Sequence, residues 1–243
     1  MHHVVLERWS RGASVLHRRD PRAKLAALVV FLIVLATAHR DLAAVGAAMF
    51  LLLAGALVWA RIPLAGALAR AAVVLPFSLL FVGVCWLAGD PARGAALLLK
   101  SYLSALAVLT VVSTTPLPLL LRGMESVGAP RFLLMVAQFL YRYLFVISEE
   151  AQHMSKAAAS RGATLRGATS GSERFHAAAG ALAVLFARSY GRAEDIHRAM
   201  LARGFLGRFR TLHTLRFGRA EGVFLALAVL APVALRAAIE RMP

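Results

Sequence analysis

Acidic residues and cysteine are scarce in this sequence of 243 residues. It contains 12 Asp and Glu against 28 Lys and Arg, and one cysteine, Cys85. A single cysteine cannot close an intrachain disulfide, and it leaves no cysteine cluster for a metal ion. The long apolar stretches described below hold no carboxylate, so they lack a titratable pair for general acid–base catalysis. A membrane-embedded enzyme is therefore the less favoured of the alternative functions.

Several motifs that would indicate catalysis or metal binding are also missing. The sequence has no G-x-x-x-x-G-K-[S/T] phosphate-binding loop, no H-E-x-x-H and no G-x-S-x-G. Its eight histidines include no H-x-x-x-H pair, and His153, His176 and His197 stand among arginines. We therefore expect no metal site and no cofactor in this chain. Energy from ATP would have to come from a partner protein.

Apolar residues dominate what is present. They make up 60% of the chain, and the mean hydropathy is +0.69, well outside the usual range of soluble domains. A helix needs about 20 apolar residues to cross a bilayer. Five stretches approach that length: 23–38, 42–60, 71–89, 95–115 and 222–239. The sequence thus predicts an all-α, polytopic integral membrane protein with about five spans, in which Lys24 reaches the interface from the end of its span.

The net charge of +16 is concentrated beside the apolar stretches. Basic residues precede the first stretch, and residues 151–220 hold twelve Lys or Arg against three Asp or Glu. Excess positive charge marks the cytoplasmic side of a membrane protein, so the N-terminus and this block are expected there. Nucleic-acid binding is the rival explanation of the charge, but the aromatic residues of the block lack a stacking pattern. Attraction to lipid headgroups or an acidic partner accounts for it better.

A sixth apolar stretch, 132–148, is the ambiguous one. If it crossed the membrane, the basic block after it would lie outside, and Gln138 and Arg142 make it a poor span. We therefore expect an amphipathic helix at the cytoplasmic interface, although a six-span protein stays an alternative. The expected domains are a four-span membrane domain at 1–115, a cytoplasmic or interfacial helical domain at 116–220, and a closing span at 221–243.

One short pattern occurs twice in the basic block. Lys156-Ala157-x-x-Ser160-Arg161-Gly162 and Arg198-Ala199-x-x-Ala202-Arg203-Gly204 share a basic residue, alanine, a small residue, arginine and glycine. Acids precede arginines in both segments and glycine follows, which predicts helices at 149–162 and 189–204 that end at the glycines. Such an end is either an ordinary C-terminus or a slim, arginine-tipped element that docks in the groove of another protein.

The chain also resembles a known family in four of its stretches. These are "DPRAKL" at 20–25, "MESVGAPRFLLMVAQFLYRYLFVISEE" at 124–150, "SKAAASRGA" at 155–163 and "SYGRAEDIHRAMLARGF" at 189–205. With them the sequence resembles the transmembrane T component, of the CbiQ type, of energy-coupling factor ABC importers. The resemblance implies a non-catalytic subunit of the bacterial cytoplasmic membrane that transmits the motion of two ATPase subunits to a substrate-binding membrane subunit. ATP would bind in the partner subunits.

The resemblance also assigns roles to residues. Arg161 and Arg203 match the arginines that dock into the two ATPase subunits of that family, within the signatures Ser160-Arg161-Gly162 and Ala202-Arg203-Gly204. Ser160 stands where the family usually has alanine. The implied substrate is the cobalt ion, with nickel or a vitamin as alternatives.

Overall fold

The computed structural model describes residues 9–10, 12–38, 41–161, 171–207 and 218–241. The described chain consists of helices and their connections, without a β-strand. It divides into two units: the first contains Met1–Ala129 and Thr214–Pro243, and the second contains Pro130–His213. The predicted all-α fold is confirmed. The two units are described separately below.

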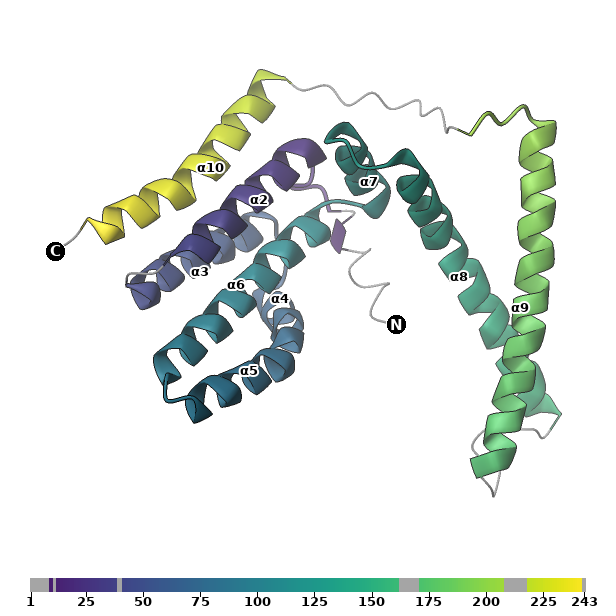
Figure 1. Ribbon diagram of the computed structural model, residues 1–243. Helices are drawn as coiled ribbons and strands as arrows, with labels where there is room; N and C mark the ends of the chain where they lie inside the picture. Colours follow the sequence, from purple (N-terminus) through teal and green to yellow (C-terminus); the bar gives the residue numbers. More distant parts are fainter. Residues whose placement is uncertain (1–8, 11, 39–40, 162–170, 208–217, 242–243) are drawn as a thin grey trace. The chain divides into compact units, whose positions relative to one another are not determined.

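The first unit contains most of the apolar helices (Figure 1). Its elements are α2 (Pro21–Thr37), α3 (Leu42–Trp59), α4 (Leu64–Ala71), the 3₁₀ turn η1 (Ala72–Val74), α5 (Leu75–Leu87), α6 (Pro91–Thr114), α7 (Leu117–Ser126) and α10 (Arg219–Glu240). Two of these helices begin at an Asp-Pro pair. Asp20 accepts a hydrogen bond from the Arg22 amide at 2.9 Å, and Asp90 accepts one from the Arg93 amide at 3.1 Å. An aspartate at the cap followed by proline is a strong start signal for a helix.

Helix α6 lies at the centre of the first unit, where it packs against α2, α3, α4 and α5. Leu103 and Leu106 of α6 and Met49 and Leu57 of α3 are fully buried in this core. At Gly46 of α3 a Cβ atom would stand 2.5 Å from a methyl carbon of Leu99. The glycine thus lets α3 and α6 approach closely, as small residues do between membrane helices.

Two lysines join α2 and α6 at opposite ends of the pair. Lys24 is 3% exposed, and its Nζ donates to the Thr114 carbonyl and to the Thr115 hydroxyl, both at 2.9 Å. Lys100 donates to the carbonyls of Ala36 and Ala38 at 2.9 and 2.7 Å. The last carbonyls of a helix have no partner within it, and positive charge is favourable there. The expectation that Lys24 extends to the interface is therefore wrong, because the lysine caps the neighbouring helix instead.

The C-terminal end of α2 receives a second cation from α10. Arg236 donates to the Val34 carbonyl at 3.2 Å and to the Thr37 carbonyl at 2.9 Å, while its Nε pairs with Glu240 at 2.9 Å. These carbonyls lack the usual backbone amide donor within α2, because they belong to the last turn of the helix. Lys100 and Arg236 supply donors for the last turn of α2.

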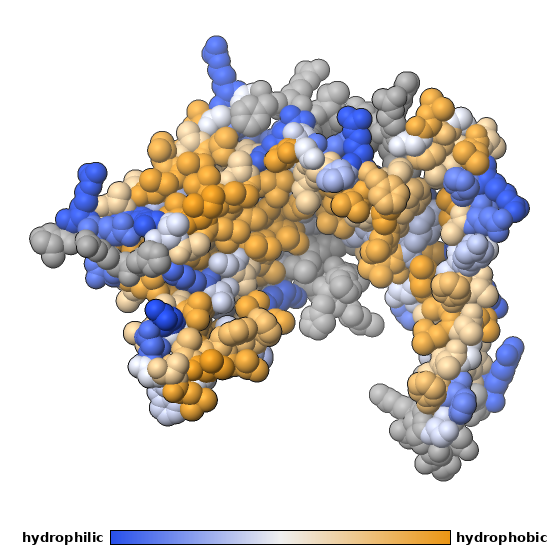
Figure 2. Space-filling view, viewed as in Figure 1, coloured by the Kyte–Doolittle hydropathy of each residue, from blue (hydrophilic) through white to orange (hydrophobic). Residues whose placement is uncertain are grey.

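Five helical segments of the described residues are long and apolar enough to cross a membrane. They are Leu42–Trp59, Leu64–Leu87, Pro91–Thr114, Arg131–Ser160 and Arg219–Glu240. Apolar side chains cover much of the surface in view (Figure 2), and Phe77 and Trp86 of α5 are 70% and 71% exposed, as expected of lipid-facing residues. The chain is a multi-pass membrane protein.

The predicted spans correspond to these helices with three differences. The third predicted span, 71–89, lies in the segment Leu64–Leu87, which begins earlier and contains the 3₁₀ turn η1. The first predicted span, 23–38, corresponds to α2, whose 17 residues reach about 25 Å, near the lower limit for crossing. The sixth stretch, 132–148, forms the first half of α8 (Arg131–Ser160), a segment that is long and apolar enough to cross. Its placement at the interface stays a prediction, as do the expected domains; residues 116–129 group with the first unit by their contacts.

The second unit consists of two long helices, α8 and α9 (Gly171–Ala202). They run antiparallel (Figure 1), and Arg188 of α9 forms an ion pair with Glu150 of α8. Most of the described side chains of both helices are exposed within this unit, and Leu134 is the buried residue of α8. The predicted helices 149–162 and 189–204 are the C-terminal parts of these longer helices.

Candidate functional site

The first copy of the repeated pattern lies where α8 ends. Ser160 is the last helical residue, and its hydroxyl donates back to the Lys156 carbonyl at 3.1 Å. The amide of Arg161 donates to the Ala158 carbonyl at 3.1 Å, which tightens the final turn. Both Ser160 and Arg161 are exposed. Gly162 lies outside the described residues, so its predicted capping role stays a prediction.

The second copy has a complete helix termination. Helix α9 ends at Ala202, and Gly204 has a φ angle of 73°. The Gly204 amide donates to the Leu201 carbonyl at 2.9 Å, and the Phe205 amide donates to the Met200 carbonyl at 3.0 Å. This pair of bonds around a left-handed glycine is the Schellman motif. The prediction that Gly204 terminates this helix is confirmed.

Glycine is required at position 204 by the backbone angle. A side chain costs about 1–2 kcal/mol in the left-handed region, and the bonds that follow reverse the chain direction directly after Arg203. Ala202, Arg203 and Gly204 are all exposed. The arginine is thus held at the tip of α9 by a rigid turn, with small residues on both sides of it.

Charge pairing distinguishes the terminal arginines from the others in α8 and α9. Arg198 forms an i,i+4 ion pair with Glu194, and Arg188 pairs with Glu150. Arg161 and Arg203 form no ion pair with any residue that the structure describes. Each guanidinium group carries a planar fork of donors that suits carboxylate and carbonyl acceptors on another molecule.

The two arginine ends lie at opposite ends of the second unit. Because α8 and α9 are antiparallel, the end of α8 lies near the first turns of α9, far from Gly204 (Figure 1). Helix α9 has 32 residues, which corresponds to about 48 Å. The candidate site therefore has two separate parts, and the five predicted residues that the structure describes do not come together in one cluster.

The surface near the C-terminal end of α9 carries exposed apolar side chains in addition to the small residues beside Arg203. Leu201 is 55% exposed and Leu206 is 83% exposed, although both flank a basic helix tip. Large exposed apolar groups beside an arginine are typical of protein interfaces. Sequence reasoning pointed to the arginines but not to these neighbours, because an apolar residue is equally compatible with a core position.

The Glu150–Arg188 pair is a further feature that the sequence did not predict. Its partners lie 38 positions apart on different helices, and local spacing gives no signal for such a pair. It joins α8 to α9, and because the Arg188 side chain is 63% exposed the pair contributes at most about 1 kcal/mol. No group of three or more His, Cys, Asp or Glu lies close enough to hold a metal ion in the described ranges.

Comparison with known proteins gives matches along most of the chain. The family model described as cobalt transport protein, CbiQ, matches residues 12–214. An energy-coupling factor transporter transmembrane protein EcfT of Acidaminococcus fermentans is 30% identical, with 93% of this chain and 95% of the relative covered. The protein of the same name from Bacillus selenitireducens is 28% identical over 96% of each chain. A cobalt transport protein CbiQ of Rhodobacter capsulatus is 29% identical over 51% of this chain and 49% of its own.

Proposed function

Since the chain belongs to the family of CbiQ cobalt transport proteins, we propose that it couples the ATPase subunits of an energy-coupling factor importer to a substrate-binding membrane subunit. The membership makes it a subunit of a transporter, with an energy-coupling role. The observation that carries the finer proposal is the pair of exposed arginines at the ends of α8 and α9, which form no ion pair within the described residues. The absence of a phosphate-binding loop from the sequence requires that ATP be bound elsewhere in the complex.

The proposed coupling is mechanical. Each arginine tip docks into a groove of one ATPase subunit, where the guanidinium finds carboxylate or carbonyl acceptors. When the ATPases close on ATP, the two tips are displaced relative to each other. Helices α8 and α9 are linked by the Glu150–Arg188 ion pair, so a displacement at either tip is transmitted along stiff helices. The substrate-binding subunit is then shifted through the membrane helices that hold it.

Cobalt ion is the proposed substrate, because both the family description and the Rhodobacter relative name cobalt transport. The substrate-binding subunit would hold the ion. The two longer matches carry the general transporter name without a substrate, which keeps nickel or a vitamin as the alternative. The protein is proposed to lie in the bacterial cytoplasmic membrane with its N-terminus on the cytoplasmic side, where the basic segments are favoured.

Co-purification tests the docking role directly. The tagged chain is expressed with the two ATPase subunits of its importer and purified in mild detergent, as wild type and as the Arg161→Ala/Arg203→Ala variant. We expect the wild type to retain both ATPases and the double variant to lose them, because two desolvated charge contacts of about 2–5 kcal/mol each disappear. Uptake of radioactive cobalt in whole cells should fall to background in the same variant.

A matched control removes equal charge from the same helices. Arg142 of α8 and Arg192 of α9 are exposed and stand at least ten residues before the ends of their helices, so Arg142→Ala/Arg192→Ala should keep the ATPases. Equal loss in both double variants would mean that bulk charge, and not the two tips, binds the partner. Full cobalt uptake by the Arg161→Ala/Arg203→Ala variant would refute the coupling assignment.

A further inference from the structure

The first unit contains an apolar cavity of about 510 Å³ between α2, α3, α6 and α10. Phe31 of α2, Leu53 of α3, Val111 of α6 and Phe224 of α10 are among its walls. Thr110 and Thr114 also line it, but their hydroxyls donate to backbone carbonyls of their own helix at 2.8 Å. The uncharged side chains that line the cavity are therefore apolar or hydrogen-bonded within their own helix. Charged side chains line it only at one end.

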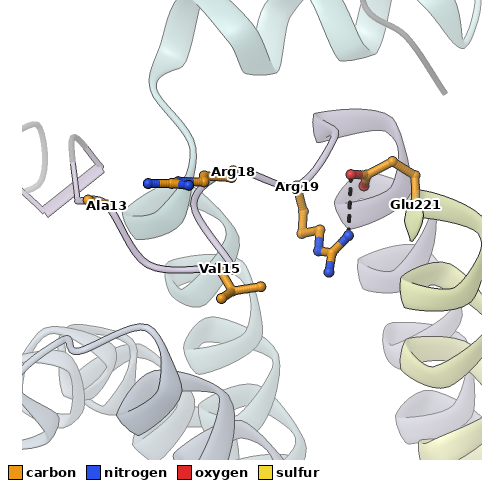
Figure 3. A pocket seen from close by; sticks show the side chains of 5 residues that line it. All are labelled: Ala13, Val15, Arg18, Arg19 and Glu221. Atoms are coloured by element: carbon orange, nitrogen blue, oxygen red, sulfur yellow. Dashed lines mark ion pairs between the residues drawn. The ribbon is translucent and has the colours of Figure 1, made fainter. Parts of the chain in front are cut away.

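That end is basic and opens beside a second hollow. Arg19 and Lys24 line the cavity there, and Arg19 also lines a hollow of about 460 Å³ together with Ala13, Val15, Arg18 and Glu221 (Figure 3). Arg19 lines both spaces. We treat them as one site with a long apolar part and a cationic mouth.

The carboxylate of Glu221, which lies at the mouth, already has partners within the chain. One oxygen of Glu221 faces Arg19 at 3.5 Å (Figure 3), and the other accepts the backbone amide of Asp20 at 3.0 Å. Arg19 donates further to the Ala220 carbonyl at 3.2 Å and lies over the ring of Phe224. Asp20 accepts the Arg22 amide. These bonds neutralise the acid and fix α10 against the start of α2.

Positive charge remains after this pairing. Arg18 is exposed and forms no ion pair with any part of the chain that the structure describes. Lys24 uses two of its three N–H donors. A negatively charged group that carries several acceptor oxygens, such as a phosphodiester, fits this mouth, since guanidinium and phosphate form strong charge-assisted bonds.

The side of the cavity opens between helices that lie in a membrane. Trp59 of α3 and Val223 and Leu227 of α10 line the cavity and are 62%, 59% and 65% exposed. Both helices are among those long and apolar enough to cross a bilayer. A hollow with apolar walls does not hold water, and acyl chains are the apolar groups that surround membrane helices. The volume is also within the range of about 300–1,000 Å³ for ligand sites.

We propose that the first unit binds one anionic phospholipid, with an acyl chain in the cavity between α2, α3, α6 and α10 and its phosphodiester at Arg18 and Arg19. The proposal goes beyond the coupling function and does not depend on it. An acyl chain gains little by moving from the bilayer into an apolar cavity, because both surroundings are equally apolar. Selectivity among lipids must therefore come from the headgroup.

Native mass spectrometry of the purified full chain tests this site. The protein is titrated in detergent with phosphatidylglycerol or phosphatidylethanolamine that carry identical acyl chains. We expect one phosphatidylglycerol molecule to remain bound in preference to phosphatidylethanolamine, because the ammonium group that phosphatidylethanolamine carries beside its phosphodiester is repelled by Arg18 and Arg19. Arg18→Gln should reduce that preference about fivefold, the effect of about one basic residue near a phosphate, whereas Arg93→Gln, which removes an exposed charge at the start of α6, should not.

A second pair of variants tests the chain-binding part. Ala228 of α10 lines the cavity, so Ala228→Phe should fill it and lower the retention of both lipids. Ala226 is exposed on the same helix and does not line the cavity, so Ala226→Phe should retain the lipid. Equal retention of the two lipids by the wild type, or unchanged retention in both Arg18→Gln and Ala228→Phe, would overturn the proposal. Displacement of the lipid by inorganic phosphate alone would also overturn it, because the chain would then contribute nothing.

Discussion

Replacing Lys24 by methionine tests whether a buried ammonium group holds two membrane helices together. Lys24 is 3% exposed, and its Nζ bridges the Thr114 carbonyl and the Thr115 hydroxyl at the end of α6. Methionine has a similar length and fills the same space. The substitution therefore removes the two hydrogen bonds and the charge without opening a large cavity.

Two opposing terms set the size of the effect. Hydrogen bonds to a charged group contribute about 1.5–3 kcal/mol each, but burying an ammonium ion costs several kcal/mol, and methionine relieves that cost. The Thr115 hydroxyl can rotate to another acceptor. The Thr114 carbonyl cannot, because it lies in the last turn of α6 and faces the protein interior. The lost hydrogen bonds and the relieved burial cost roughly cancel, which leaves the unsatisfied Thr114 carbonyl as the net effect. An unsatisfied buried acceptor costs about 1–3 kcal/mol, so we expect the free energy of unfolding to fall by that amount.

Lys100→Met is the matched comparison. Lys100 also bonds two carbonyls at a helix end, but it is only partly buried, so solvent or headgroups can replace it and the loss should be about 0.5–1.5 kcal/mol. Unfolding in mixed micelles, titrated with sodium dodecyl sulfate and followed by circular dichroism, measures both values. A Lys24→Met protein as stable as the wild type would refute the proposed role of the lysine. A larger loss for Lys100→Met would show that burial does not determine the effect.

Two further predictions concern the second unit. Gly204→Ala should speed hydrogen exchange of the Gly204 and Phe205 amides about 5–30-fold, because the left-handed backbone costs alanine about 1–2 kcal/mol; unchanged exchange would mean that the Schellman turn is absent. Reporter enzymes fused after residues between 151 and 168 should be active on the cytoplasmic side; a periplasmic signal would exclude the five-span arrangement and favour the crossing of α8.

Helix content and the approximate spans could be predicted because they depend on composition averaged over many residues. Helices α3, α6 and α10 begin and end within a few residues of the expected stretches. The continuity of α8 could not be predicted in this way. Its composition changes from apolar to polar near Ser148, which looks like a boundary, yet no glycine or proline interrupts the helix between Arg131 and Ser160. Hydrophobicity changes there while helix propensity does not.

The groups to which Lys24 and Arg236 donate their hydrogen bonds could not be predicted from the sequence either. Lys24 and Thr114 are 90 positions apart, and Arg236 reaches α2 across 202 positions. Position along an apolar stretch indicates that a lysine near the end can extend to the interface, but it does not tell which neighbouring helix offers free carbonyls. The glycine at position 204 was predictable because its cap is formed within six residues of the chain. A helix cap formed by neighbouring residues can therefore be predicted from the sequence, whereas contacts between residues far apart in the chain cannot.

The separation of the two arginine tips bears on why the pattern occurs twice. Helix α9 alone spans about 48 Å, more than the diameter of a small domain, so one groove cannot accommodate both Arg161 and Arg203. If each tip binds its own ATPase subunit, the chain is held at two points, and the second contact forms at a high effective concentration once the first exists. Arg161→Ala and Arg203→Ala should then each leave part of the ATPase bound, while the double variant loses it all. A pattern used once would give attachment but no relative displacement, and only two separated contacts convert the closure of a pair of ATPases into movement of α8 and α9.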